Sequence, residues 1–443
     1  MSSRVSCLLT TNASGAGNIC RSSVWSIERM PCPPLERKEC QKTDASSIKK
    51  NNCFIIMRSV WSPKTNSRPM ERIMHVIETN SAKLTFNPQG GHLEEVAFGS
   101  RADRIRPMHR APWRTGEDNG GRPERVPAAM GQSLASLSGD FFCAPFGHDD
   151  VSGTVEHGLT ANGVWLEESF QTDADGTVTA IFRLDGQVAG AAVFKELTLK
   201  PDQPIVYQRH RFVGGFGMLP VAHHPMVRIT GEASLNFSPK AFGATPEHAV
   251  ETDPQRGNSA LMYPQEFVDL TSVRLKGGGA VDLSVQPGPP DSEDFLILAE
   301  EPNSTMGWTA VSARDDGFLF FSVRDPRVLP FSMLWMSNGG RHYEPFSGRH
   351  RGVLGLEEGC TFFGYGREAS SRPNWLNERG YPTAIELVPD GEVAIGFAFG
   401  AIRLPDGWRA VSDIGVSREN LIISSDTEAT VELPFWMDGV FSR

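Results

Sequence analysis

The chain has 443 residues, 39% of them hydrophobic and 22% charged, which is the ordinary composition of a globular protein. Residues 1–69 carry 11 Lys and Arg against 4 Asp and Glu, so residues 70–443 carry 32 against 49 and form an acidic body. That charge argues against a nucleic-acid partner, and the lack of an apolar run of about 20 residues argues against a membrane-spanning helix.

Residues 1–73 are predicted to be a disordered or non-native extension, because they are rich in Ser, Asn and Arg and show no hydrophobic period. Met70 and Met74 are alternative start positions. No apolar core of about 7–15 residues indicates a secretory signal, whereas a transit peptide stays open. The extension holds five cysteines, and a disulfide or zinc module is the alternative, although no CxxC pair occurs. These are Cys7, Cys20, Cys32, Cys40 and Cys53. The body, with two cysteines, favours a cytoplasmic setting.

From His75 onward the sequence alternates between strand patterns and turn signals such as Asp-Gly, Pro-Asp and Gly-Gly. The segments 177–184 and 392–399, TVTAIFRL and EVAIGFAF, each place every second residue on one apolar face. Further strands are predicted over 193–199, 205–212, 227–237, 281–285, 295–298, 309–313, 317–323, 331–336, 385–388 and 429–435. Strands at this density without intervening helices favour an all-β fold, a large antiparallel β-sandwich or barrel, formed by residues 74–443 as one domain.

An Arg-, Pro- and Gly-rich tract over 100–138 interrupts the strands. A loop of this length is either a solvated surface insertion or a functional segment. No Gly-rich phosphate loop opens a helix, since GGFGM at 214–218 leads into AHHPM, and no GxSxG elbow occurs. The sequence therefore gives no support for a nucleotide cofactor or for serine hydrolase chemistry.

Three stretches gather titratable residues among strand-like neighbours. The first is 138–165, the second is 221–228 (VAHHPMVR), and the third is 335–360, which contains Glu357 inside GVLGLEEG. A buried carboxylate must be paired, protonated or used, so Glu357 forms either a salt bridge to Arg349 or Arg351 or one half of an acid–base pair. Histidine titrates near neutrality, and Pro225 ends regular strand pairing beside His224, which makes that imidazole the candidate partner.

Three motifs in this order resemble those of the aldose 1-epimerases, the galactose mutarotase-like superfamily, across residues 75–437. HGLTANGVW after APFG is similar to that family's HGxxxxxxW segment, AHHPM to its G-x-H-P-aromatic strand, and LWM followed by GLEEG to its Trp strand and Glu-bearing strand. The resemblance implies a supersandwich fold and a small-molecule sugar as the partner. It also implies three catalytic residues: His224 as the general acid at the ring oxygen, Glu357 as the base at the anomeric hydroxyl, and His157 as a residue that holds the sugar and assists at the ring oxygen.

The same resemblance implies that no metal and no organic cofactor is needed. It assigns the sugar-binding positions to His148 and Asp149, which stand where the family often has an arginine, and to Trp165 and Trp335, whose rings could stack on the sugar. The chain departs from the family pattern at Met226 and at Glu358. These departures leave the sugar, its phosphorylation and the activity itself open.

Two other classes of function remain open. One is a carbohydrate-binding protein on the same fold without turnover. The other is a metal cluster of histidines in a cupin-like barrel, for which imidazoles are suitable ligands. Its members would be His148, His157, His223, His224 and His342. Strand alternation points His223 away from His224, which favours a structural role for His223. The oligomeric state is not indicated.

Overall fold

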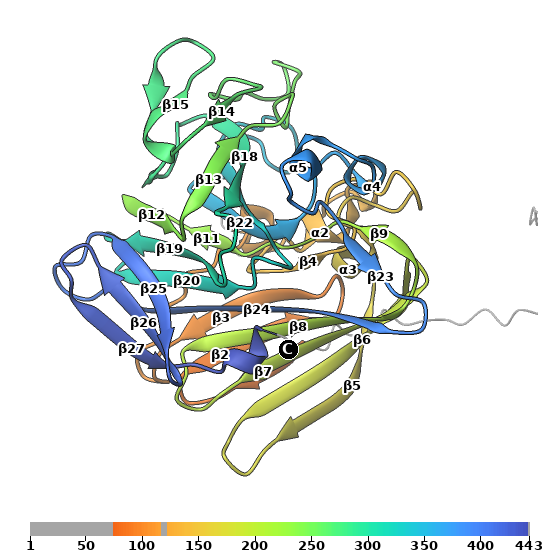
Figure 1. The fold of residues 1–443 in the computed structure, drawn as a ribbon, viewed down its shortest axis with the longest axis vertical. Coiled ribbons are helices and arrows are strands. Elements are labelled where there is room, and N and C mark those ends of the chain that lie inside the picture. The colour runs from red at the N-terminus through yellow and green to blue at the C-terminus, as the bar shows by residue number, and fades with distance from the viewer. Residues whose placement is uncertain (1–73, 117–121, 442–443) are drawn as a thin grey trace, which may run out of the picture. The chain divides into compact units, whose positions relative to one another are not determined.

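The computed structural model describes residues 74–116 and 122–441, and the cysteine-rich segment at the start of the chain lies outside them. Two large antiparallel sheets dominate this part of the chain, which confirms the all-β prediction (Figure 1). The eight-stranded sheet has the order β14 (Glu266–Phe267), β13 (Lys240–Ala244), β18 (Ser292–Glu300), β21 (Phe331–Asn338), β22 (Val353–Cys360), β10 (Val221–His223) and β4 (Phe142–Cys143), and β11 (Met226–Arg228) pairs with β22.

The second large sheet has nine strands and continues the antiparallel pattern. Its order is β17 (Val285–Gln286), β12 (Ala233–Phe237), β19 (Gly307–Ala313), β20 (Phe318–Arg324), β24 (Glu392–Arg403), β8 (Ile205–Gly214), β7 (Ala191–Leu199), β6 (Val178–Val188) and β5 (Trp165–Thr172). Both segments that alternate in the sequence fall in this sheet, as β6 and β24, with their apolar faces buried.

Smaller sheets and short helices complete the described part of the fold. The strands are β1 (His75–Glu78), β2 (Ala82–Asn87) and β3 (His92–Phe98); β9 (Gly217–Leu219) with β23 (Ile385–Leu387); β15 (Val273–Arg274) with β16 (Ala280–Val281); and β25 (Val411–Ser417), β26 (Asn420–Ser425) and β27 (Thr430–Pro434). The helices are α1 (Pro112–Thr115), α2 (Gly131–Ala135), α3 (Gly158–Asn162), α4 (Arg367–Ser371) and α5 (Trp375–Glu378), with 3-10 turns at Ala128–Met130, Leu270–Ser272 and Met437–Gly439.

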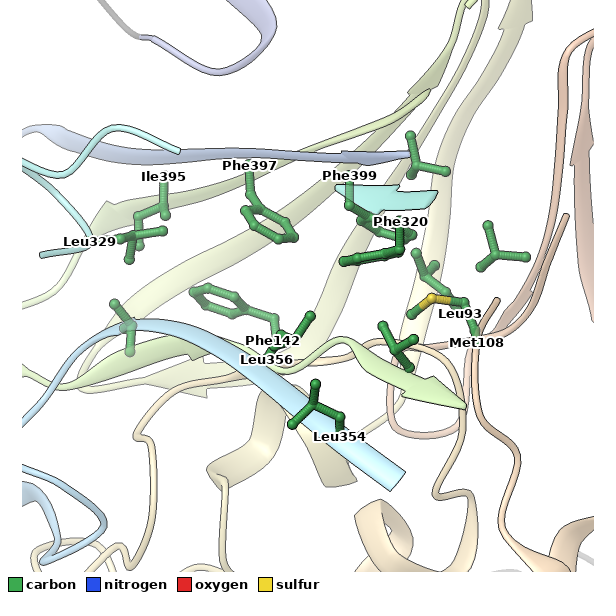
Figure 2. Close-up of a cluster of buried hydrophobic side chains, with 14 of the residues drawn as sticks. Leu93, Met108, Phe142, Phe320, Leu329, Leu354, Leu356, Ile395, Phe397 and Phe399 are labelled. Carbon is green, nitrogen blue, oxygen red and sulfur yellow. The ribbon is translucent and has the colours of Figure 1, made fainter. Parts of the chain in front are cut away.

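The main core lies between the two large sheets. Figure 2 shows Phe397 and Phe399 of β24 facing Phe142 of β4 and Leu356 of β22, and all four side chains are buried. One face of the eight-stranded sheet is therefore committed to this core. Its other face carries a second hydrophobic cluster and is free to form a site.

Two predicted strands are interrupted. The segment predicted as one strand over 227–237 splits into β11 and β12, because Asp315 and Asp316 accept the backbone N–H groups of Glu232 and Thr230 at 3.0 and 2.9 Å. The strand predicted over 281–285 is a turn between β16 and β17, in which Asp282 accepts the N–H of Ser284 at 2.8 Å.

The tract over 100–138 is more than a solvated insertion in its described residues. Trp113 is fully buried and donates its indole N–H to the Leu134 carbonyl at 2.8 Å. The backbone N–H of His109 donates to the Met226 carbonyl at 2.9 Å, and the His109 side chain is buried. This part of the tract is packed against the strand that follows the histidine pair.

Candidate active site

The interruption of a strand by His224 and Pro225 creates the centre of the candidate site. Strand β22 pairs with β10 before this break and with β11 after it, in one continuous register: His223 lies opposite Glu358 and Met226 opposite Gly355. The same register places His224 opposite Glu357. Residues directly opposite each other in an antiparallel pair project from the same face, so the two side chains meet.

The backbone around the break holds His224 in place without a regular ladder. Its N–H donates to the Phe141 carbonyl at 3.0 Å and to Asp140 Oδ1 at 2.9 Å. The Pro225 carbonyl accepts the N–H of Leu356 at 2.8 Å, which keeps β22 alongside. Pro225 has no backbone N–H to donate, and the buried carboxylate of Asp140 gives the N–H of His224 an additional acceptor.

His224 Nε2 lies 3.0 Å from Glu357 Oε1, and the two side chains are only 5% and 3% exposed. Burial raises the pKa of Glu357 well above its ordinary value; nearby Glu156 adds to this rise and Arg341 opposes it. Burial, with a smaller effect from His157, lowers the pKa of His224 well below its ordinary value. Both directions favour a neutral carboxylic acid hydrogen-bonded to a neutral imidazole.

His157 stands beside this pair in a left-handed backbone conformation, with φ of 67°. Its ring centre lies 5.6 Å from that of His224, with the rings nearly perpendicular. The next residue must be glycine, because a Cβ on Gly158 would lie 2.2 Å from the Ala144 carbonyl oxygen. The His-Gly dipeptide is thus a tight turn that brings an imidazole to the pair, and strained backbone of this kind is frequent at functional sites.

The three residues open into a cavity of about 740 Å³. Trp335 lines it, and its ring centre lies 5.6 Å from that of His224. Trp335 pairs in register with Gly355, where a Cβ would lie only 3.1 Å from the indole, so the glycine leaves room for the ring beside Glu357. A cavity of this size with apolar walls and a few convergent polar groups is typical of a small-molecule site.

The other predicted binding residues have different positions. His148 lines the cavity. The Asp149 carboxylate instead accepts from Ser152 N at 2.8 Å and Thr154 Oγ1 at 2.7 Å, so it holds its own loop and does not line the cavity. Trp165 is 2% exposed within the main core and donates to the Thr160 carbonyl at 3.0 Å, so its ring face is not available to a sugar.

His223 points to the opposite face, as alternation predicts. Its ring stacks on Phe397 in the core with centres 4.2 Å apart, and its Nδ1 lies 3.9 Å from Asp140 Oδ2. The arginines considered as salt-bridge partners of Glu357 are bound elsewhere: Arg349 pairs with Glu124 and Arg351 with Asp291. The carboxylate of Glu357 therefore faces the histidine.

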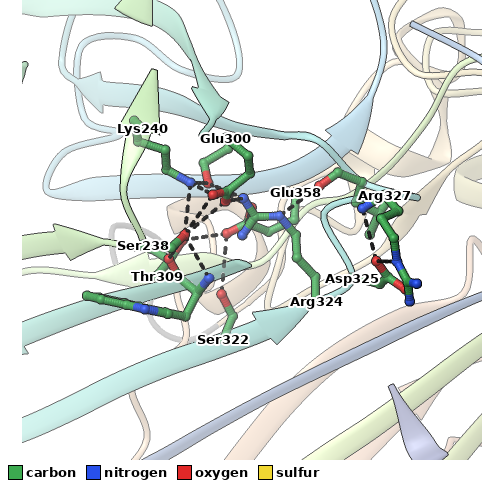
Figure 3. Close-up of polar contacts among 12 residues, drawn as sticks. Ser238, Lys240, Glu300, Thr309, Ser322, Arg324, Asp325, Arg327 and Glu358 are labelled. Carbon is green, nitrogen blue, oxygen red and sulfur yellow. Dashed lines mark hydrogen bonds and ion pairs between the residues drawn. The ribbon is translucent and has the colours of Figure 1, made fainter. Parts of the chain in front are cut away.

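Glu358, next to Glu357, projects between the two large sheets. It accepts hydrogen bonds from Thr309 Oγ1 at 2.6 Å and Ser332 Oγ at 2.9 Å, forms an ion pair with Arg324 Nη1 at 2.8 Å, and is fully buried. Figure 3 shows Arg324 between Glu358 and Glu300. The two adjacent glutamates therefore lie in different surroundings: Glu358 belongs to a buried ionic network, and Glu357 faces the cavity.

Two cavity residues were not singled out from the sequence. Glu156, beside His157, lines the cavity and is exposed to it; burial alone would raise its pKa, but His157, His148 and Arg341 together lower it. Arg341 places its guanidinium 4.6 Å from the Phe346 ring centre and 5.7 Å from that of Trp335. The loop between β21 and β22 thus supplies a cavity arginine, and no local sequence pattern reports its inward direction.

The five histidines of the metal hypothesis do not converge. His223 is buried on the far face of the sheet and His342 is exposed. Within residues 74–116 and 122–441, no group of three or more His, Cys, Asp or Glu side chains is arranged to hold a metal ion. Cys143 and Cys360 are buried, and neither forms a disulfide within the described part of the chain. In the same described segments, no helix is long and apolar enough to cross a membrane.

No protein-family model and no curated protein matches the sequence. The structural neighbours are galactose mutarotase or aldose 1-epimerase-like proteins at low sequence identity. One is a candidate aldose 1-epimerase from Escherichia coli, 13% identical over 75% of this chain and 99% of that one, with a TM-score of 0.48. A galactose mutarotase related enzyme from Lactobacillus acidophilus is 13% identical over 75% and 99%, with a TM-score of 0.45. An aldose epimerase homologue from C. elegans is 12% identical over 75% and 100%, with a TM-score of 0.40.

Proposed function

We propose that the cavity is the active site of an aldose 1-epimerase-like enzyme that interconverts the α and β anomers of a free sugar. The observation that carries this proposal is the buried contact of 3.0 Å between His224 Nε2 and Glu357 Oε1 at the wall of a cavity of about 740 Å³. An acid and a base at this short distance can act on the ring oxygen and the hydroxyl oxygen of the anomeric carbon, because both oxygens are bonded to that one carbon and also lie close to each other.

Ring opening uses the pair in its ionic form. Glu357 takes the proton of the anomeric hydroxyl while His224 gives its proton to the ring oxygen. The bond between the anomeric carbon and the ring oxygen breaks, and an aldehyde forms. Rotation about the C1–C2 bond presents the other face of the aldehyde. Reclosure returns one proton from Glu357 to the carbonyl oxygen and one from the new hydroxyl to His224, which gives the other anomer.

The proton count of the pair supports this reaction. The imidazolium–carboxylate form and the neutral form hold the same number of protons, so the cycle needs no exchange with solvent. Burial favours the neutral form of the pair, in line with the raised pKa of Glu357 and the lowered pKa of His224. Sugar oxygens that replace the direct hydrogen bond would give each group a polar partner and so stabilise the ionic form.

The neighbouring residues have supporting roles in this proposal. Gly147 donates its N–H to Nδ1 of His157 over 3.4 Å, so the ring proton of the neutral imidazole is on Nε2 and can be donated to a sugar oxygen. Trp335 offers an apolar wall and His148 a polar one. The chemistry requires only side chains of this chain, and the proposed partner is a small sugar.

Polarimetry on a freshly dissolved anomer tests the proposal directly. The wild-type protein should speed mutarotation above the spontaneous rate, and both His224→Ala and Glu357→Ala should remove the acceleration while the melting transition is retained. Normal acceleration by either folded variant would refute the assignment. If calorimetry detects saturable sugar binding while the wild-type protein gives no acceleration, the protein is a carbohydrate-binding protein instead.

A further inference from the structure

A chain of buried hydrogen bonds lies behind Trp335. His109 Nε2 is 3.0 Å from His350 Nε2, and His350 Nδ1 is 2.7 Å from Ser337 Oγ. Ser337 Oγ donates to Glu293 Oε2 at 2.8 Å. All four side chains are 5% exposed or less. The chain joins the 100–138 tract to strands β18 and β21 and to the loop that follows β21.

The other oxygen of Glu293 holds two residues of the cavity wall. It accepts the indole N–H of Trp335, and it lies 3.1 Å from Nε of Arg341. Rings stack across the same region: His350 lies between Trp335 and Trp113, with ring centres 5.5 and 5.4 Å away. Glu293 itself does not line the cavity, so it acts on a ligand only through these neighbours.

The direction of every proton in the chain follows from the residue types. Burial lowers the pKa of His109 to about 3, and burial with smaller effects of His109 and Arg341 lowers that of His350, so each ring is neutral and carries one N–H. Burial raises the pKa of Glu293 above its ordinary value, and Arg341, Ser337 and Trp335 oppose this rise. The contacts define the carboxylate as the acceptor: Trp335 Nε1–H and Ser337 Oγ–H both donate to it, and Arg341 forms an ion pair with it.

Ser337 gives its only proton to Glu293, so its oxygen must accept from His350 Nδ1–H. Nε2 of His350 then has no proton and must accept from His109 Nε2–H. The structure thus defines opposite tautomers for the two histidines: the Nε2–H form at His109 and the Nδ1–H form at His350.

We infer that Glu293 is a positioning residue for sugar binding, which fixes Trp335 and Arg341 in the cavity wall and sets the tautomers of His350 and His109. The inference rests on the proposed function in so far as a sugar occupies the cavity. It also assigns a role to the buried part of the 100–138 tract, which backs the wall through His109 and Trp113. The acid–base pair is outside this network, because neither His224 nor Glu357 has a hydrogen bond with Glu293.

The variant Glu293→Gln should reverse the direction of the hydrogen bonds that run from His109 to Ser337. If its amide oxygen keeps Trp335 and Arg341, its NH₂ group faces Ser337, whose hydroxyl must then donate to His350 Nδ1. His350 would carry its proton on Nε2, and His109 on Nδ1. We expect the KM for the sugar to rise about ten-fold, because a charge-assisted hydrogen bond to the wall is lost, with kcat within about two-fold of wild type.

The ring ¹⁵N resonances of the full-length protein, labelled at histidine, distinguish the two tautomers. The wild type should show Nε2–H at His109 and Nδ1–H at His350, and Glu293→Gln should exchange them. The matched control is Asp294→Asn, which removes the adjacent buried charge on the opposite face, where Asp294 accepts from Leu261 N at 3.0 Å. It should change neither the tautomers nor the KM.

Opposite tautomers in the wild type would overturn the inference even if no variant folds. So would a folded Glu293→Gln that keeps the wild-type KM and tautomers, or one that loses kcat at unchanged KM. If the wild type binds sugar without turnover, the proposed function fails, and the dissociation constant from calorimetry replaces KM in the same comparison. If it binds no sugar, the positioning role fails with the proposed function, and the tautomers then report on the hydrogen-bond chain alone.

Discussion

Replacing the adjacent Glu357 and Glu358 by glutamine should have opposite effects. Burial raises the pKa of Glu357 well above its ordinary value and so favours its neutral form; Gln then replaces a neutral group of the same shape, and folding stability at pH 7 should be unchanged or slightly higher. Loss of the base should reduce the mutarotation rate by about 10²–10⁴-fold. At about 1.4 kcal/mol per ten-fold, this corresponds to a barrier higher by about 3–5 kcal/mol.

Glu358→Gln should cost stability and spare turnover. Its carboxylate is fully buried and holds Arg324, whose guanidinium would lose half of its ionic partners. Removing one member of a buried ion pair typically costs about 3–5 kcal/mol, which lowers the melting temperature by several degrees. Polarimetry and calorimetric unfolding on the same samples test both variants. If Glu358→Gln is folded but as inactive as Glu357→Gln, the division of roles between the two faces of β22 is wrong.

Three further predictions concern acid, aromatic rings and metal. Burial lowers the pKa of His92 and His109 from 6.5 to about 3, so below pH 6.5 the unfolded chain binds protons that the folded protein does not. Folding stability is therefore highest above pH 6.5 and falls as the pH drops towards 3, and near pH 5.5 each histidine should lower the free energy of unfolding by about 1 kcal/mol. A melting temperature at pH 5.5 equal to that at pH 7 would contradict this. Trp335→Ala should weaken sugar binding in calorimetry, whereas Trp165→Ala should cost about 3–5 kcal/mol of stability with unchanged affinity; the reverse pattern would exchange their roles. EDTA should leave the rate unchanged, and a loss restored by added metal ion would refute a side-chain mechanism.

The fold class could be predicted because strand alternation is a local signal. Segments 177–184 and 392–399 became β6 and β24 with the expected faces buried. The breaks at 229–232 and 282–284 both depend on carboxylates that capture backbone N–H groups, and at 282–284 the carboxylate is the local Asp282, so that turn had a sequence signal. For residues 229–232 those carboxylates come from Asp315 and Asp316, far along the chain, so no local pattern reports them.

The candidate site was predictable where it depends on residue type and unpredictable where it depends on register. The sequence indicated His224 and Glu357, and the pairing of β22 with β10 and β11 explains their contact. Trp165 and Trp335 look equivalent in the sequence, yet one belongs to the core and the other to the cavity. Arg341 lies in a loop and forms an ion pair with Glu293 on another strand, and this contact has no local sequence signal.

The two adjacent glutamates of β22 differ in how fully their carboxylate oxygens are satisfied. On the core face Glu358 accepts hydrogen bonds from Thr309, Ser332 and Ser322, the last at 3.3 Å, and forms an ion pair with Arg324. On the cavity face Glu357 Oε2 and His224 Nδ1 are buried without a hydrogen-bond partner in the described residues. Each such atom costs about 1–3 kcal/mol. Nearby, His157 adds a left-handed backbone of similar cost.

If strand β22 had only a structural role, an apolar residue in place of Glu357 would increase folding stability, because the neighbouring side chains on the cavity face form a hydrophobic cluster. Between the two adjacent glutamates, the unsatisfied oxygen thus belongs to Glu357, where a ligand could relieve its cost, whereas both oxygens of Glu358 accept hydrogen bonds. This asymmetry predicts that sugar binding raises the melting temperature of the wild type more than that of Glu357→Leu. An equal rise in both would mean that Glu357 is buried for a reason other than the ligand.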